Sequence, residues 1–129
     1  MTGDETATGP AGPVERARAY YRALDEDDYD LLESVLAPEF VHERPDVTLS
    51  DRDRFVRFMR EERPVSDTSH AIDGVYRRDA DTGEGSEAAA EIAVRGRLLG
   101  PDGEQLGGFV DVFSFGGPRI ARIETYVDG

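Results

Sequence analysis

The feature of this chain that most constrains its fold is a change of hydrophobic periodicity near Pro64. Before this point, apolar residues recur every three or four positions, which is typical of amphipathic helices. After it, four stretches are typical of strands, at about 68–79, 87–99, 105–116 and 119–127, and the segments between them carry turn residues at 81–85, 100–103 and 116–118. Helices followed by an antiparallel meander predict an α+β fold with one helical layer on one sheet.

The first half of the chain predicts three helices. Pro13 suits the first position of a helix, because an N–H at that position would have no partner within the helix. Either Asp27 or Asp28 can cap the second helix, and Ser50 with Asp53 resembles a capping box for the third. Residues 40–45 are expected to be extended, since a proline ends that segment. The expected apolar faces are Val14, Ala17, Tyr21 and Leu24, with Tyr20 beside them; Leu31, Leu32, Val35 and Leu36; and Phe55, Phe58 and Met59.

The length and composition predict one domain. The chain has 129 residues, of which 1–12 are small and polar and are expected to form a disordered lead-in to a domain spanning 13–129. It contains no cysteine, which excludes disulfides and a cysteine nucleophile and favours a cytoplasmic location. No apolar run approaches the roughly 20 residues of a membrane span, and the N-terminal residues do not resemble a secretion signal.

The charge is strongly acidic and widely spread. The formal net charge is −13, every basic residue is an arginine, and the acidic residues run from Asp4 to Asp128. This charge disfavours nucleic acid as a partner. Its dispersal favours a hydrated acidic surface of the halophilic kind, which stays soluble at high salt, over a localised acidic interaction surface.

One carboxylate stands on an aromatic strand face. Asp111 shares its parity with Phe109, Phe113 and Phe115, so all four side chains should lie on one side of a strand. An ionised carboxylate there is costly, so it must be partnered, lie in a polar cavity, or be protonated through a raised pKa. Each of these alternatives points to a pocket.

The strand expected near 88–98 separates two kinds of side chain. Ala88, Ala90, Ile92 and Val94 share one parity and are expected to face the core. Glu91, Arg95 and Arg97 share the other parity, which places them on the outer sheet face. Ion pairs across strands or within a dimer suit these three better than catalysis does.

Two segments resemble a known family. Residues 19–40 read AYYRALDEDDYDLLESVLAPEF and residues 109–126 read FVDVFSFGGPRIARIETY. Together with the order of elements they resemble the opening helical pair and the closing hairpin of the SnoaL-like branch of the nuclear transport factor 2-like superfamily. The resemblance implies three N-terminal helices packed in the concave face of a curved, mainly antiparallel sheet. It also implies a pocket at the open end of this cone and, often, a homodimer through the outer sheet face.

Within this superfamily, ketosteroid isomerase offers the nearest mechanism to test. The resemblance places Tyr20 and Asp111 at the tyrosine and the protonated acid of its oxyanion hole. The position of its base falls at Arg44, and a guanidinium does not abstract a proton at ordinary pH. His42 or Glu43 could act as the shuttle if the register slips by one or two residues. A SnoaL-type cyclase needs only one carboxylate or imidazole, for which Asp111 or His42 would serve.

The remaining candidates concern the pocket and metals. The predicted pocket lining is Phe40, Arg44, Phe55, Phe58, Met59, Phe109 and Phe113, and Arg44 could hold an anionic group. His70 has no partner nearby in the sequence. Because His42 and His70 share no helical spacing and no carboxylate cluster, no metal site is predicted.

Two functions remain open at this stage. One is the binding of a small hydrophobic carbonyl compound with cofactor-independent isomerisation, cyclisation or dehydration, in which Asp111 and Tyr20 stabilise an enolate oxygen. The other is a non-catalytic ligand-binding or dimerisation module, in which Asp111 only ties Tyr20 to the sheet.

Overall fold

The computed structural model describes residues 12–62, 68–78 and 91–128. Apart from Gly12, the expected lead-in at 1–12 lies outside these ranges, as do the turn at 81–85 and the beginning of the strand expected at 87–99. Within the described part of the chain, no helix combines the length and the apolar composition that crossing a bilayer requires.

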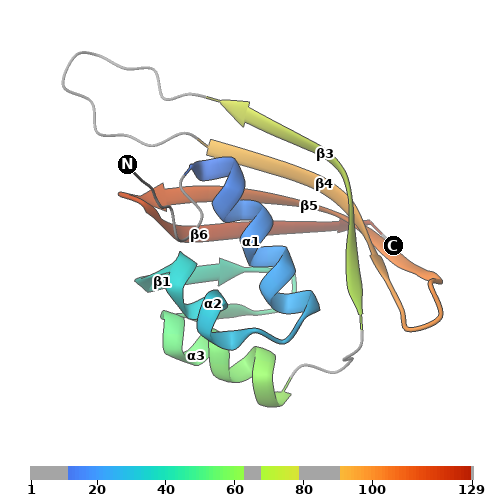
Figure 1. Ribbon diagram of the computed structural model, residues 1–129, viewed down its shortest axis with the longest axis horizontal. Coiled ribbons are helices and arrows are strands. Elements are labelled where there is room, and N and C mark those ends of the chain that lie inside the picture. Colours follow the sequence, from blue (N-terminus) through green and yellow to red (C-terminus); the bar gives the residue numbers. More distant parts are fainter. Residues whose placement is uncertain (1–11, 63–67, 79–90, 129) are drawn as a thin grey trace, which may run out of the picture.

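The described residues form one helical layer on one sheet. The helices are α1 (Pro13–Asp25), α2 (Tyr29–Val35) and α3 (Arg52–Arg57), and the π-helix η2 (Phe58–Glu62) continues α3. The strands are β1 (Leu36–Glu43), β2 (Thr48–Ser50), β3 (Ser69–Arg78), β4 (Glu91–Leu99), β5 (Gln105–Gly116) and β6 (Arg119–Asp128). The six strands lie in the order β2-β1-β6-β5-β4-β3 (Figure 1). All neighbours are antiparallel except β1 and β6, which are parallel.

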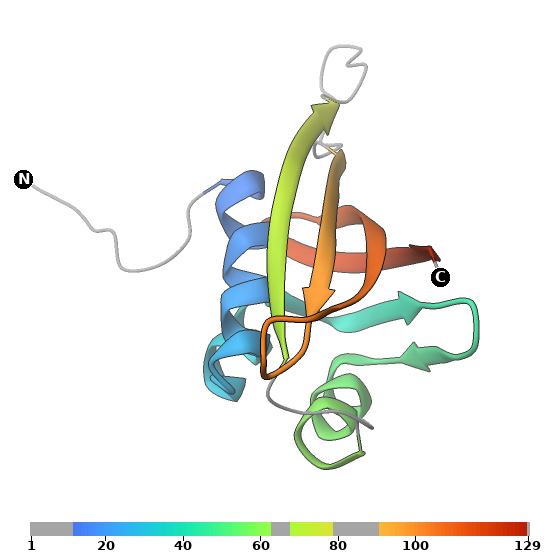
Figure 2. The ribbon, with the colours of Figure 1, turned by 90° about the vertical axis from the view of Figure 1, so that its right-hand side faces the viewer.

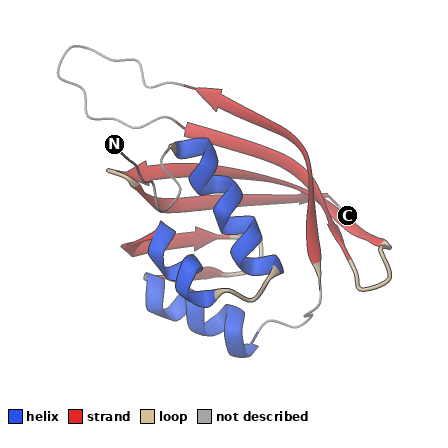
Figure 3. Cartoon of the chain, viewed as in Figure 1, coloured by secondary structure: helices blue, strands red, loops and turns tan. Residues whose placement is uncertain are grey.

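The helices cover one face of a curved sheet, which confirms the predicted α+β class. Figures 2 and 3 show the helices gathered on one side while the strands bend around them. On β4 the predicted parity holds for the described residues: Ile92 and Val94 are buried and Arg95 is exposed. The core between the layers includes Ala17, Leu24, Leu32, Leu36, Phe40, Phe55, Phe113, Ile120 and Ile123.

Helix capping corrects one sequence prediction. Asp28 caps α2 as expected, since its carboxylate accepts the Leu31 N–H at 3.1 Å. The cap of α3 is Asp51, which accepts the Arg54 N–H at 2.8 Å, and not the predicted Ser50. Ser50 is still paired with Val41 in the β1–β2 hairpin, so the capping position falls one residue later.

The junction between α2 and β1 was also predicted imprecisely. The second helix ends at Val35, and Leu36 is already the first residue of β1. Pro38 therefore lies inside a strand, where it would break a continuous ladder. The pairing of β1 with β6 shifts register between Leu36 and Val41, so Pro38 falls where the ladder is interrupted.

Candidate functional site

Asp111 lies on the inner face of β5, and its carboxylate is held by two side chains. Only 6% of the residue is exposed. The Tyr21 hydroxyl of α1 donates to Oδ2 at 2.6 Å, and the Thr125 hydroxyl of β6 donates to Oδ1 at 2.5 Å. The expected alternative of a partnered carboxylate is therefore met by one helix and one neighbouring strand.

Tyr21 makes the hydrogen bond that had been expected from Tyr20. Successive residues in a helix are turned by about 100°, so adjacent tyrosines face different surroundings. The Tyr20 ring packs edge-on against Phe113, with ring centroids 5.5 Å apart, and stacks with Phe55 at 6.2 Å. Tyr20 thus lies in the aromatic core, and Tyr21 is the tyrosine that reaches the carboxylate.

The network continues from Thr125 to His42 on β1. His42 Nε2 lies 2.8 Å from Thr125 Oγ1. Because an ionised carboxylate can only accept, the Thr125 hydroxyl donates to Asp111 and accepts from the Nε2–H of His42. The other ring nitrogen, Nδ1, is buried and has no partner among the described residues. The chain of hydrogen bonds therefore runs from His42 through Thr125 to Asp111.

The surroundings of His42 disfavour its protonation. Burial, with a smaller contribution from the Arg44 charge, lowers the pKa of His42 to about 3. A ring with this pKa is neutral at ordinary pH and is a weak base. The geometry thus favours His42 as a hydrogen-bond donor that orients Thr125, and gives no support to its expected role as a proton shuttle.

The Tyr21–Asp111 pair retains its protons more strongly than isolated groups would. Burial raises the pKa of Asp111, and the hydrogen bonds from Thr125 and Tyr21 only partly oppose this effect. Burial also raises the pKa of Tyr21, and the neighbouring Asp111 charge raises it further. The carboxyl group is thereby biased towards its neutral form, while the phenol remains protonated.

Glu43 and Arg44 lie at the end of β1 with different surroundings. Glu43 has the outward parity and its carboxylate lies 2.6 Å from the Arg122 guanidinium. This placement contradicts its expected role as a shuttle for Asp111, because alternate residues of a strand face opposite sides. Arg44 pairs with Asp46 at 3.5 Å. Burial, the larger effect, raises the pKa of Asp111 and lowers that of His42. The nearby Arg44 charge lowers the pKa of both groups.

Most of the aromatic residues predicted to line a pocket belong to the core. Phe40, Phe55 and Phe113 are fully buried, and Met59 is 7% exposed. The partly buried Phe58 lies under the Arg54 guanidinium, 5.9 Å from the ring centroid, and Phe109 is half-buried. The rings of Phe40 and Phe55 lie beside His42, and those of Phe109 and Phe113 lie beside Tyr21. The role of the predicted lining residues in holding a ligand stays a prediction.

A second polar pair lies beside the network, at the start of β3. His70 Nδ1 lies 2.6 Å from Oδ1 of Asp25, the last residue of α1, and the His70 backbone N–H donates to Oδ2 at 3.1 Å. The His70 ring packs against Tyr21, with ring centroids 5.1 Å apart, and edge-on against Phe109 at 5.6 Å. The sequence offered no partner for His70, and the fold supplies one from 45 residues away.

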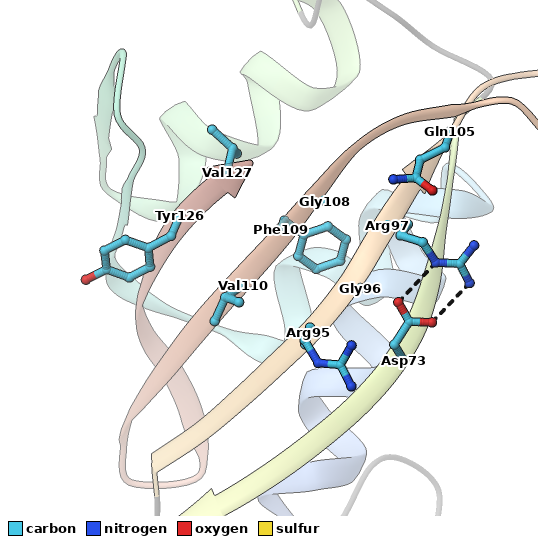
Figure 4. A pocket seen from close by; sticks show the side chains of 10 residues that line it. All are labelled: Asp73, Arg95, Gly96, Arg97, Gln105, Gly108, Phe109, Val110, Tyr126 and Val127. Atoms are coloured by element: carbon cyan, nitrogen blue, oxygen red, sulfur yellow. Dashed lines mark hydrogen bonds and ion pairs between the residues drawn. The ribbon is translucent and has the colours of Figure 1, made fainter. Parts of the chain in front are cut away.

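The outer side of the sheet carries a groove of about 420 Å³. Figure 4 shows its lining, in which Arg97 and Asp73 form an ion pair beside Arg95 and across from Tyr126. Phe109 is the only member of the predicted pocket lining that also borders this groove. In the described ranges, no group of three or more histidine, aspartate or glutamate side chains is arranged to hold a metal ion.

Tyr21 and Thr125 are the network members that the sequence prediction missed. Tyr21 was placed in the apolar stripe of the first helix, which correctly faces the sheet, but only the position of β5 shows which tyrosine reaches Asp111. Thr125 faces Asp111 directly in the β5–β6 ladder. Pairing counted back from the turn, without interruption, would place Glu124 opposite Asp111. The register shift between Ser114 and Phe115 moves the partner by one residue, to Thr125.

Comparisons with known proteins agree with this architecture. Residues 17–123 match the family described as the SnoaL-like domain. The chain therefore belongs to the SnoaL-like family. No protein with a curated description matches the sequence.

Three similar solved structures illustrate the fold. A nuclear transport factor 2-like protein of unknown function from Cytophaga hutchinsonii is 11% identical, with 95% of each chain covered and a TM-score of 0.70. A proposed ketosteroid isomerase from Kribbella flavida is 18% identical, with 88% of this chain and 76% of that one covered, at 0.68. A proposed polyketide cyclase from Sinorhizobium meliloti is 19% identical, with 87% and 94% covered, at 0.66. At these identities the likeness shows the fold alone.

Proposed function

We propose that this SnoaL-like protein binds a small, largely hydrophobic carbonyl compound and catalyses cofactor-independent proton transfer next to the carbonyl group. The reaction would be an isomerisation, a cyclisation or a dehydration. The observation that carries the proposal is the buried Asp111 carboxyl, which Tyr21 and Thr125 hold and whose pKa burial raises. A buried carboxyl group whose pKa is raised is suited to act as an acid or as a hydrogen-bond donor.

The chemistry would depend on a reversal of the Tyr21–Asp111 hydrogen bond. When Asp111 is ionised, the Tyr21 hydroxyl donates to it and has no hydrogen left for a ligand. When Asp111 is protonated, its O–H can donate to the Tyr21 oxygen, and the phenol hydrogen can then turn to a substrate oxygen. This hydrogen bond strengthens as the substrate oxygen becomes an enolate, which lowers the barrier to proton removal from the adjacent carbon.

The proposal is tested by the isomerisation of cyclohex-3-en-1-one to its conjugated isomer, followed by ultraviolet absorbance. We expect Asp111→Asn to lower kcat/KM by about 100-fold or more, which is the usual loss when a transition-state hydrogen bond is removed. Glu91→Gln is the matched control, since it makes the same change from carboxyl to amide at a residue that pairs with Arg78 on the outer face. Unchanged turnover in Asp111→Asn would contradict the proposal.

The alternative of a non-catalytic binding module predicts a different result. The wild-type protein would bind 2-naphthol, a neutral phenol whose oxygen resembles that of an enol, and would leave cyclohex-3-en-1-one unchanged. In that case Asp111→Asn would alter only the affinity for 2-naphthol, measured by its fluorescence.

We also propose that two copies associate through the outer sheet face. Tyr76 and Tyr126 are 53% and 57% exposed there, with the half-buried Val110 opposite Tyr126 in the ladder. Exposed tyrosines on a sheet face are typical of protein interfaces. Sedimentation at high salt, which screens the net charge of −13, should show a dimer that Tyr126→Glu converts to monomer. A wild-type protein that sediments as a monomer would contradict this.

A further inference from the structure

His70 is held at two points by one carboxylate. Asp25 accepts from the ring through Oδ1 at 2.6 Å and from the backbone N–H of the same residue through Oδ2 at 3.1 Å. Both carboxylate oxygens are thereby used by His70, and the ring cannot rotate without losing the shorter bond. The arrangement fixes the imidazole between the C-terminal end of α1 and the first residues of β3.

The pairing also decides which ring nitrogen carries a hydrogen. A carboxylate offers only acceptors, so the nitrogen facing it, Nδ1, must be the one that bears the hydrogen. In the neutral ring Nε2 then has a free lone pair. A histidine oriented in this way by a carboxylate has the arrangement that general bases use in proton transfer.

His70 is linked to Asp111 through Tyr21. Tyr21 touches both groups, with its hydroxyl on Asp111 and its ring 5.1 Å from the His70 ring. Access also differs between the two histidines, because His70 is partly exposed whereas His42 is buried and its Nε2 is paired with Thr125. His42 Nδ1 is buried without a partner, whereas His70 Nε2 is not among the buried unpartnered atoms of the described residues and takes no part in the network.

We propose that His70 is the general base of the site and that Asp25 is the positioning residue that orients it. This inference rests on the proposed function, for which it supplies the missing base. The lone pair of His70 Nε2 takes a proton from the carbon next to the substrate carbonyl. The C–H electron pair forms a carbon–carbon double bond, and the π electrons of the carbonyl move to its oxygen, which becomes an enolate oxygen held by Tyr21. The proton on His70, which can exchange with water, is then delivered to the γ-carbon as the enolate oxygen becomes a carbonyl again, which completes an isomerisation with no net reactant.

The first test follows exchange of the α-hydrogens of cyclohex-3-en-1-one in D₂O by ¹H NMR. We expect His70→Gln to lower kcat for exchange by about 100-fold or more with a KM within a few-fold of wild type, because a base acts on the chemical step. Added imidazole should restore part of the exchange in His70→Ala. A residue that only ties α1 to β3 would show neither the split between kcat and KM nor the rescue.

The outcomes separate this inference from the proposed function. If Asp111→Asn abolishes exchange while His70→Gln stays within threefold of wild type, the base lies elsewhere and the inference fails alone. If exchange is unchanged in Asp111→Asn, the proposed function itself fails. Glu91→Gln serves again as the control, since it breaks an ion pair with the same strand, β3, on the opposite face.

A second test reads the orientation of the ring without relying on activity. We expect long-range ¹H–¹⁵N spectra to show His70 with its hydrogen on Nδ1. In Asp25→Asn, the amide cannot accept from both the ring and the backbone N–H, so we expect a mixture of tautomers and a lowered kcat. A wild-type spectrum with the hydrogen on Nε2, or one that Asp25→Asn leaves unchanged, would overturn the role given to Asp25.

Discussion

The two faces of the sheet hold an aspartate in similar geometry with opposite effects on its charge. On the inner face, Asp111 accepts from Tyr21 and Thr125, and burial raises its pKa. On the outer face, Asp73 accepts two hydrogen bonds at 3.0 Å from Arg97, and these bonds lower its pKa. Each carboxylate has two hydrogen bonds, so solvent access and the charge of the partner decide the direction of the shift.

Because of this difference, the two faces are suited to different roles. A carboxylate beside a guanidinium in solvent remains charged and is suited to surface pairing and solubility. A carboxyl group beside two hydroxyls in the core holds its proton more strongly than an exposed one, because burial disfavours the charged form. We accordingly place the proposed proton transfer on the inner face and the proposed association between copies on the outer face.

The largest expected difference between the faces is a loss of folding stability at low pH that arises on the inner face. The pKa of His42 is lowered to about 3, so its stabilising contribution is present above its usual value of 6.5 and is lost as the pH falls from 6.5 towards 3. Relative to His42→Gln, which can still donate to Thr125, the wild type should lose roughly 5 kcal/mol across this range. Urea denaturation at stepwise lower pH measures the difference, and parallel curves for the two proteins would contradict the buried, neutral ring.

Removal of the central hydroxyl should give the next largest effect. Thr125→Val leaves Asp111 Oδ1 and the Nε2–H of His42 without partners in a buried site. We expect the free energy of unfolding to fall by about 2–4 kcal/mol, since each buried polar group without a partner costs about 1–3 kcal/mol. Chemical denaturation at pH 7 is the measurement. A loss below about 0.5 kcal/mol, within the range of ordinary surface substitutions, would show that the network contributes little.

A packing change on the inner face should have a somewhat smaller effect. A Cβ at Gly96 would lie 2.5 Å from the Ala71 carbonyl oxygen and 2.8 Å from Phe109 Cζ. We expect Gly96→Ala to cost about 1–3 kcal/mol and to displace Phe109 from its place beside Tyr21. Gly116→Ala is the control on the neighbouring strand, where the nearest atom would be 3.4 Å away. Equal melting temperatures for the two variants would contradict the close approach.

The smallest effect is expected on the outer face. Asp73→Asn removes the charge of the ion pair with Arg97 but leaves both residues in contact with solvent. We expect almost no change in the melting temperature at 0.15 M salt, because water replaces the lost interaction. A loss as large as that of Thr125→Val would erase the distinction between the faces.

The fold followed from the sequence because periodicity and turn residues are local signals. The switch near Pro64 and the parity of Ile92 and Val94 correctly indicated one helical layer on a sheet with an apolar inner face. Asp111 was recognisable for the same reason, as a charge whose alternate neighbours are phenylalanines.

The partners of Asp111 could not be predicted because they depend on register and on helix rotation. A shift in the β5–β6 ladder selects Thr125, and a rotation of about 100° per residue selects Tyr21 over Tyr20. The Asp25–His70 pair joins the end of a helix to a strand that begins 44 residues later, so no local sequence pattern predicts it. These contacts exist only once the helices are docked.

The most direct test of the central claim is a titration of the Asp111 side-chain carboxyl by ¹³C NMR, with Asp73 in the same spectra as an internal reference. We expect the Asp111 midpoint to lie above the usual value of 3.8, and the Asp73 midpoint to lie below it. An Asp111 midpoint at or below 3.8 would mean that the carboxylate is a permanently charged structural anchor, and would contradict its role in proton transfer.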